Sequence, residues 1–169
     1  MIHLNIGSNL VSNFGSKSKN ISIAIKLLIS LKIKIKKISS FYETPSYPNK
    51  TYPNYLNIGV LCEYSYSYKK LFKQIKLIEK KIGRIKSIKN SPRVCDIDII
   101  DFNGLIKLEK SVSLPHPRSH LRNFVLYPIR EIDPKWIHPI YKKNVDFLIN
   151  QLGQKPRIEI TRLLKSVII

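Results

Sequence analysis

The stretch YLNIGVLCEYSYSYKKLFKQIKLIEKKIG, Tyr55 to Gly83, decides the fold. From position 56 to 64 every second side chain is apolar or aromatic, which is the pattern of a strand that buries one face. From position 68 to 82 the period changes to that of a helix with one apolar stripe. The residues of this stripe are Leu71, Ile75, Ile78 and Ile82, and Gly83 suits the helix C-terminus. The stretch therefore predicts a strand followed directly by an amphipathic helix.

The segments on either side repeat this pairing of strand and helix. Upstream, residues 2–6 read as a strand, residues 19–32 as an amphipathic helix and residues 33–44 as extended chain. Downstream, SPRVCDIDIID (91–101) reads as a buried strand bounded by Pro92. The order β-α-β-β-α-β is that of a ferredoxin-like unit, whose helices pack on one face of an antiparallel sheet. We therefore expect an α+β fold.

The rest of the chain is expected to add further strands and helices to this core, within a single domain that spans residues 1–169. No internal repeat or linker divides the chain. We expect a hairpin around residues 104–114, helices near 120–131 and 144–152, and a strand near 157–163.

The chain is strongly basic, with 30 Lys and Arg against 11 Asp and Glu and a formal net charge of +19. Such a charge suits nucleic acid, a membrane surface or a polyphosphate as partner. A second explanation is mutational, because the chain is rich in Lys, Ile, Asn and Tyr, as if its codons had drifted towards A and T. The lysines are spread along the chain rather than gathered in one tract, which favours drift.

The cysteines and the apolar segments indicate where in the cell the protein is found. Cys62 and Cys95 lie far apart, without the spacing of a zinc site, and suit free thiols in a reducing compartment. The N-terminus lacks the basic and apolar regions of a secretory signal. The longest apolar stretch, Ile21 to Ile35, is interrupted by three lysines and is too polar to span a bilayer. We therefore expect a cytoplasmic protein that is not bound to a membrane.

Two acids, Asp96 and Asp98, lie one residue apart in the Ile-rich strand. Side chains alternate along a strand, so both carboxylates point to the same face and repel each other unless a cation lies between them. Mg²⁺ takes oxygen ligands and commonly bridges carboxylates to phosphate oxygens. On this pair alone, a metal site and a solvated polar face of the strand explain the residues equally well.

The loop before these acids carries a cluster of cations. They are Arg84, Lys86, Lys89 and Arg93. Cations beside a carboxylate pair are what a metal–polyphosphate site requires, because they take up the phosphate charge that the metals leave. A solvated basic loop would explain the cluster by itself. Together with the two acids, the cluster favours a phosphate site.

A third group of residues suits a flat heterocycle. Tyr55 and Asn57 share the face of their strand opposite its apolar stripe, where a ring can stack and an amide can pair with the edge of the ligand. Two ordinary residues of a sheet surface are the simpler alternative. The loops 7–20, 44–54 and 83–93 could meet at one end of the sheet. The sequence contains neither a Walker A loop nor GxGxxG, which excludes an ordinary P-loop or Rossmann site.

Taken in order, six segments of the chain resemble the 6-hydroxymethyl-7,8-dihydropterin pyrophosphokinases of the folate pathway. The resemblance covers nearly the whole chain and fades after about Trp136. The segments are IGSNL, SSFYETPSY, YLNIGV, IEKKIGR, PRVCDIDII and LPHPRSHLRNFVLYPIREIDP. No single segment is decisive, but six in register are specific.

The resemblance implies transfer of a pyrophosphoryl group from ATP to the hydroxymethyl oxygen of the pterin, with release of AMP. It implies two Mg²⁺ ions held by Asp96 and Asp98, and catalytic arginines at Arg84 and Arg93. The ATP-binding residues that it implies are Glu79, Lys86, Ile99, His116, Arg118 and Arg122. The pterin-binding residues that it implies are Thr44, Pro45, Tyr47, Tyr55, Asn57 and Phe124. The expected partners are these small substrates, with no specific nucleic acid and no membrane, and the expected state is a monomer.

The chain departs from the family pattern at several positions, and the loop after Gly83 is about one residue shorter than usual. The unusual residues are Tyr47, Lys76, Lys86, Asn90 and Ser91. They bear on loop closure and the adenine contacts and leave the reaction class unchanged. Two alternatives remain: an RNA-binding ferredoxin-like domain, although no RNP1 pattern is present, and another metal-dependent nucleotidyltransferase.

Overall fold

The computed structural model describes residues 1–85, 91–109 and 111–163. Its central sheet contains β1 (Ile2–Ser8), β2 (Lys34–Ile38), β3 (Phe41–Thr44), β4 (Tyr55–Glu63), β5 (Asp96–Phe102) and β8 (Thr161–Leu163). The strands pair antiparallel in the order β5-β1-β4-β3-β8, and β2 pairs with β4 beyond the end of β3. β6 (Lys107–Leu108) and β7 (Ser113–Leu114) pair with each other outside this sheet.

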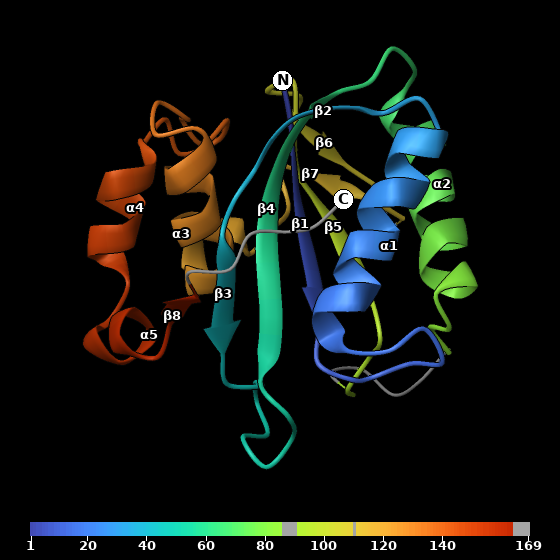
Figure 1. Ribbon diagram of the computed structural model, residues 1–169. Coiled ribbons are helices and arrows are strands. Elements are labelled where there is room, and N and C mark those ends of the chain that lie inside the picture. The colour runs from blue at the N-terminus through green and yellow to red at the C-terminus, as the bar shows by residue number, and fades with distance from the viewer. Residues whose placement is uncertain (86–90, 110, 164–169) are drawn as a thin grey trace.

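Helices cover both faces of the sheet (Figure 1). On one face lie α1 (Lys17–Ser30) and α2 (Tyr68–Lys81), and on the other lie α3 (Asn123–Ile132) and α4 (Val145–Gln151). The short helices η1 (Ser119–Leu121) and α5 (Gln154–Ile158) flank α3 and α4 in the chain. No helix within the described ranges is both long and apolar enough to cross a membrane.

The sheet is buried on both faces because two hydrophobic cores meet across it. One core packs against α1 and α2, and the second packs against α3 and α4. The register of β1 with β5 shifts by one residue between His3 and Leu4. Side chains alternate along β5, so Ile99 lies in the first core and Ile100 in the second, and beyond the shift Phe102 returns to the first core.

Local signals in the sequence set the ends of α1 and α2 and the close packing of α3. The hydroxyls of Ser16 and Ser67 accept hydrogen bonds from backbone N–H groups in the first turns of α1 and α2. Gly83 ends α2 with φ +103°, a left-handed conformation that favours glycine. A Cβ at Gly59 would lie 2.8 Å from Cβ of Pro128, so a larger residue there would push α3 off β4.

The structure confirms the α+β class and the ferredoxin-like element order. Two expectations need correction. The extended chain expected over residues 33–44 is two strands, β2 and β3, because β4 is long enough to pair with both. The strand expected near residues 157–163 begins only at Thr161, because α5 occupies the chain before it. Pro156 lies in the first turn of α5, where its missing N–H costs no hydrogen bond.

Candidate active site

One cavity of about 1320 Å³ gathers nearly all of the residues that the sequence singled out. It is lined by Thr44, Pro45, Tyr47, Tyr55, Asn57, Glu79, Arg84, Arg93, Asp96, Asp98, His116, Arg118, Arg122 and Phe124. Ile99 lines an adjoining cavity of about 270 Å³, to which Asp98 and His116 also contribute. Lys86 lies outside the described residues.

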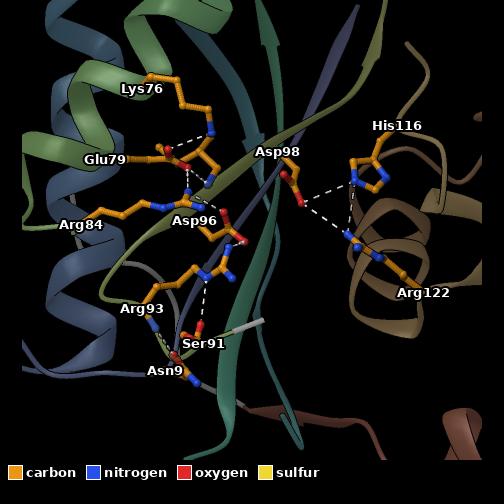
Figure 2. Close-up of polar contacts among 11 residues, drawn as sticks. Asn9, Lys76, Glu79, Arg84, Ser91, Arg93, Asp96, Asp98, His116 and Arg122 are labelled. Carbon is orange, nitrogen blue, oxygen red and sulfur yellow. Dashed lines mark hydrogen bonds and ion pairs between the residues drawn. The ribbon is translucent and has the colours of Figure 1, made fainter. Parts of the chain in front are cut away.

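Asp96 and Asp98 both point from β5 into this cavity (Figure 2). Asp96 accepts hydrogen bonds from Nη1 of Arg84 at 2.7 Å and from Nη1 of Arg93 at 3.2 Å. Asp98 has a weaker partner, since Nη1 of Arg122 lies 3.4 Å from its Oδ2. Burial and the charge of Asp96 raise the pKa of Asp98 to about 6. The second carboxylate is therefore short of positive charge.

Glu79 anchors the basic side of the site. This carboxylate is 2% exposed and accepts a hydrogen bond from the backbone N–H of Ile97 at 2.8 Å, which ties α2 to β5. It also pairs with Nζ of Lys76 at 2.8 Å and with the guanidinium of Arg84. Two cations and a backbone donor compensate the buried charge. Lys76, which is unusual for the resembled family, thus shares a carboxylate with Arg84.

His116 presents a hydrogen-bond donor to the cavity. Its Nδ1 accepts from the backbone N–H of Arg118 at 3.1 Å, so the proton of the neutral ring is on Nε2. Nε2 lies 3.4 Å from Nη1 of Arg122 and 3.9 Å from Asp98 Oδ2. Burial, and then the charges of Arg122 and Arg118, lower the pKa of His116 to about 4. The ring is therefore neutral near pH 7.

Another part of the cavity lining combines aromatic side chains with a buried amide, the groups that bind a flat heterocycle. Asn57 is buried and donates to Oγ1 of Thr44 at 3.3 Å. A Cβ at Gly7 would lie 2.7 Å from Oδ1 of Asn57, so glycine keeps space beside this amide. Tyr55 and Phe124 supply aromatic surface to the same cavity. Stacking surface and an amide edge are thus available together.

The residues present fit a hard divalent cation only in part. Within the described ranges, no three or more side chains of His, Cys, Asp and Glu gather as a metal site. Asp96 and Asp98 offer carboxylate oxygens, which are the donors that Mg²⁺ prefers. The raised pKa of Asp98 also indicates that a further cation would be favourable there. The pair suits an ion whose other ligands come from a phosphate and water.

Asn9 joins the three loops that were expected to meet, and the sequence did not single it out. Its Nδ2 donates to Oγ of Ser46 at 3.2 Å and to the carbonyl oxygen of Pro53 at 3.3 Å. Its Oδ1 accepts from the backbone N–H of Arg93 at 2.7 Å. The loop that carries Thr44 and the segment that carries Arg93 are thereby held by one buried amide.

The end of the chain also contributes a wall that was not expected. Pro156 and Glu159 line the cavity. The carbonyl oxygen of Pro156 accepts from Asn123, and Glu159 pairs with Lys50 in the loop before β4. No local sequence pattern marks these residues, because their partners lie far away in the chain.

Several known proteins are similar to this chain in sequence. Residues 3–134 match the family model of 7,8-dihydro-6-hydroxymethylpterin-pyrophosphokinase. A similar protein is the 2-amino-4-hydroxy-6-hydroxymethyldihydropteridine pyrophosphokinase of Aquifex aeolicus, 35% identical over 84% of this chain and 86% of its own length. The Synechocystis protein of the same name is also 35% identical, over 85% of this chain and 73% of its own length.

Other similar proteins are much longer than this chain. The folic acid synthesis protein FOL1 of Dictyostelium discoideum is 38% identical over 80% of this chain but over only 21% of its own length. The crystal structure of wild-type Plasmodium falciparum HPPK-DHPS superposes with a TM-score of 0.70 at 16% identity. It covers 95% of this chain, which spans about half of that structure (47%). At this identity the superposition supports the fold alone.

Proposed function

The chain belongs to the 7,8-dihydro-6-hydroxymethylpterin-pyrophosphokinase family, and on that premise we propose which reaction the residues of its cavity catalyse. ATP donates its pyrophosphoryl group to the hydroxymethyl oxygen of 6-hydroxymethyl-7,8-dihydropterin, and AMP leaves, as a step of folate biosynthesis. The observation that carries this proposal is the union, in one cavity, of a carboxylate pair, several arginines and a pocket for a flat ring.

Asp96 and Asp98 would hold the Mg²⁺ ions, two in number, that accompany ATP. The support is their shared face on β5 and the shortage of positive charge at Asp98. When bound, Mg²⁺ neutralises charge on the phosphate oxygens and makes the β-phosphorus easier to attack.

Arg84 and Arg93 exchange Asp96 for phosphate oxygens when ATP enters. Both guanidiniums now pair with Asp96, and a guanidinium binds phosphate as well as carboxylate. Glu79 keeps Arg84 anchored during this exchange. Negative charge grows on the oxygen between the α- and β-phosphorus only as its bond to the β-phosphorus breaks. The two arginines therefore act mainly in the transition state.

The reaction is an in-line displacement at the β-phosphorus. The hydroxymethyl oxygen forms a bond to the β-phosphorus, the bond from the β-phosphorus to the bridging oxygen breaks, and the hydroxyl proton passes to solvent water. AMP leaves with the bridging oxygen. The Nε2–H group of His116 and the guanidiniums of Arg118 and Arg122 hold phosphate oxygens in place, as their position on the cavity wall supports.

The pterin ring and the adenine ring bind in different parts of the site. Tyr55 and Phe124 stack on the pterin, whose polar edge pairs with Asn57 and the segment from Thr44 to Tyr47. The adenine ring occupies the smaller cavity beside Asp98, where Ile99 provides apolar surface.

Product identity tests this proposal. The protein is incubated with ATP, Mg²⁺ and the reduced pterin, and the nucleotide product is separated. AMP is the expected product. ADP would indicate transfer of one phosphoryl group, and pyrophosphate would favour a nucleotidyltransferase. An RNA-binding ferredoxin-like domain would give no turnover at all.

We also propose that the protein acts as a monomer in the cytoplasm. The carboxylates, arginines and aromatic rings that we assign to the site already lie together in the cavity of a single chain, so the proposed reaction needs no second copy. Cys62 and Cys95 are buried free thiols, and burial raises the pKa of Cys62 to about 12, which suits a reducing compartment. Light scattering at micromolar concentration should give the mass of one chain, and the mass of a dimer would contradict the proposal.

A further inference from the structure

We propose that Ser119 and His138 are positioning residues for the nucleotide side of the cavity, and that they act through the main chain of His116. This assignment rests on the function proposed above and deepens it. His138 lies outside residues 3–134, the part of the chain that the family model matches. Neither Ser119 nor His138 is among the described residues that line the two cavities.

A continuous chain of hydrogen bonds links these two residues to His116. Nε2 of His138 lies 3.2 Å from Oγ of Ser119, and this hydroxyl donates to the carbonyl oxygen of His116 at 2.9 Å. On the other side of the ring, the backbone N–H groups of Ile140 and Tyr141 lie 3.2 and 3.4 Å from Nδ1 of His138. Both side chains are buried, since His138 is 1% exposed and Ser119 is 0% exposed.

We call this chain of hydrogen bonds, from His138 through Ser119 to the carbonyl of His116, the relay. Its donors and acceptors fix the direction in which each hydrogen bond is donated. Because Nδ1 of His138 accepts from backbone N–H groups, the proton of the neutral ring is on Nε2. Nε2–H then donates to the Ser119 oxygen, and the Ser119 hydroxyl proton is left to reach the carbonyl of His116. Burial lowers the pKa of His138 to about 4, so the ring remains neutral near pH 7.

The relay ends on the residue that faces the phosphates. The N–H of His116 donates to the carbonyl oxygen of Ile100 at 2.9 Å, and its carbonyl accepts from the backbone N–H of Ser119 at 3.0 Å as well as from the hydroxyl. Nδ1 of His116 accepts from the N–H of Arg118, which turns Nε2 towards Arg122. Holding this carbonyl therefore holds both the ring and the turn that carries the two arginines.

Packing alone does not account for a serine and a histidine at these positions. A buried hydroxyl or imidazole costs free energy unless it is hydrogen-bonded, and here the bonds that satisfy both groups are the ones that lead to the carbonyl of His116. The ring of His138 is confined by those of Trp136 and Tyr141, whose centroids lie 5.5 and 4.8 Å away. A confined ring keeps Nε2 aimed at Ser119.

The test compares Ser119→Ala, His138→Phe and the double variant with the wild type. Each protein is titrated by calorimetry with Mg²⁺ and α,β-methylene-ATP, and separately with the reduced pterin. We expect nucleotide affinity to fall roughly 5- to 10-fold in each single variant, and pterin affinity and saturated kcat to change less than about twofold. Because the relay acts as a unit, the double variant should lose no more than the larger single loss.

His3→Phe is the matched control. His3 is also buried (3% exposed) and is hydrogen-bonded to Asp133 at 2.9 Å, but it shares no hydrogen bond with the relay. This variant should lower the melting temperature about as much as His138→Phe and leave nucleotide affinity unchanged. The assignment is wrong if Ser119→Ala keeps full nucleotide affinity, or if His3→Phe weakens it equally. A wild type that forms no AMP would instead overturn the proposed reaction, while the affinity comparison still judges the relay.

A second measurement needs no variant. The ¹⁵N shifts of the His138 ring in the wild type, recorded by NMR at pH 7, are expected to show the neutral Nε2–H tautomer. The Nδ1–H tautomer or a charged ring would overturn the relay.

Discussion

Replacing Asp98 by Asn is expected to stabilise the fold while it removes most of the activity. The side chain of Asp98 is 27% exposed, and its pKa is about 6 in the folded protein against an ordinary 3.8, because of burial and then the charge of Asp96. The folded state therefore binds this proton more tightly than the unfolded chain does. The stability that the protonated group contributes is lost as the pH rises from its pKa in the unfolded chain, 3.8, to its pKa in the folded protein, about 6. Above about pH 6 the ionised carboxylate destabilises the fold in full.

The size of the gain follows from the same pKa. At 1.36 kcal/mol for each tenfold difference in proton affinity, the ionised carboxylate costs the fold ~3 kcal/mol at pH 7. We reduce this figure to about 1–2 kcal/mol, because a partly exposed carboxylate keeps some of its water and water screens it from Asp96. For a chain of this length, the melting temperature should rise by roughly 2–8 °C. Turnover should fall on the order of 10²-fold or more, because a neutral amide is a poor ligand for Mg²⁺.

The assay is thermal unfolding in EDTA at pH 7 and again near pH 3.5, with turnover measured separately at saturating Mg²⁺. The stability gain of Asp98→Asn should be present at pH 7 and nearly absent near pH 3.5, where the wild-type carboxyl is protonated in the folded state and largely so in the unfolded chain. Asp96→Asn is the matched control. It should lower the melting temperature, since Asp96 partners both Arg84 and Arg93, and it should also lose turnover. A lower melting temperature for Asp98→Asn at pH 7, or near-normal turnover, would refute this reasoning.

Three further tests address the rest of the site. Tyr55→Ala and Phe124→Ala should each weaken pterin binding by roughly 1–3 kcal/mol in calorimetric titrations, through lost stacking and buried area, and a loss of nucleotide affinity instead would contradict the pterin assignment. Arg84→Ala and Arg93→Ala should bind ATP within about tenfold of the wild type but lose roughly 10²-fold in single-turnover rate. Equal losses in both would mean that these arginines only hold ground-state ATP. Chelation by EDTA should abolish turnover, and added Mg²⁺ should restore it; turnover that survives chelation would exclude metal dependence.

The core of the fold was predictable because burial leaves a local period in the sequence. Along β4 and α2 the apolar side chains recur at the strand and then the helix spacing, and both elements lie where this pattern predicts them. The same alternation placed Asp96 and Asp98 on one face of β5 without any three-dimensional information. The split of residues 33–44 into two strands was not predictable, because it depends on how much of β4 remains to be paired.

The contacts that complete the site leave no such local trace. Asn9 binds Arg93 across 84 positions, and Glu159 pairs with Lys50 across 109. The hydroxyl of Ser119 and the ring of His138 look like ordinary polar residues until the fold buries them together. Local periodicity reports which face of an element is buried, but it does not report which distant side chain lies opposite.

The most direct test of the account follows the oxygen that bridges the α- and β-phosphorus of ATP. ATP labelled with ¹⁸O at this position is converted with Mg²⁺ and 6-hydroxymethyl-7,8-dihydropterin, and the products are separated and weighed by mass spectrometry. Attack at the β-phosphorus predicts that the label is recovered in AMP, in one-to-one yield with an unlabelled pterin diphosphate. Label in the pterin product, or ADP in place of AMP, would contradict the proposed reaction.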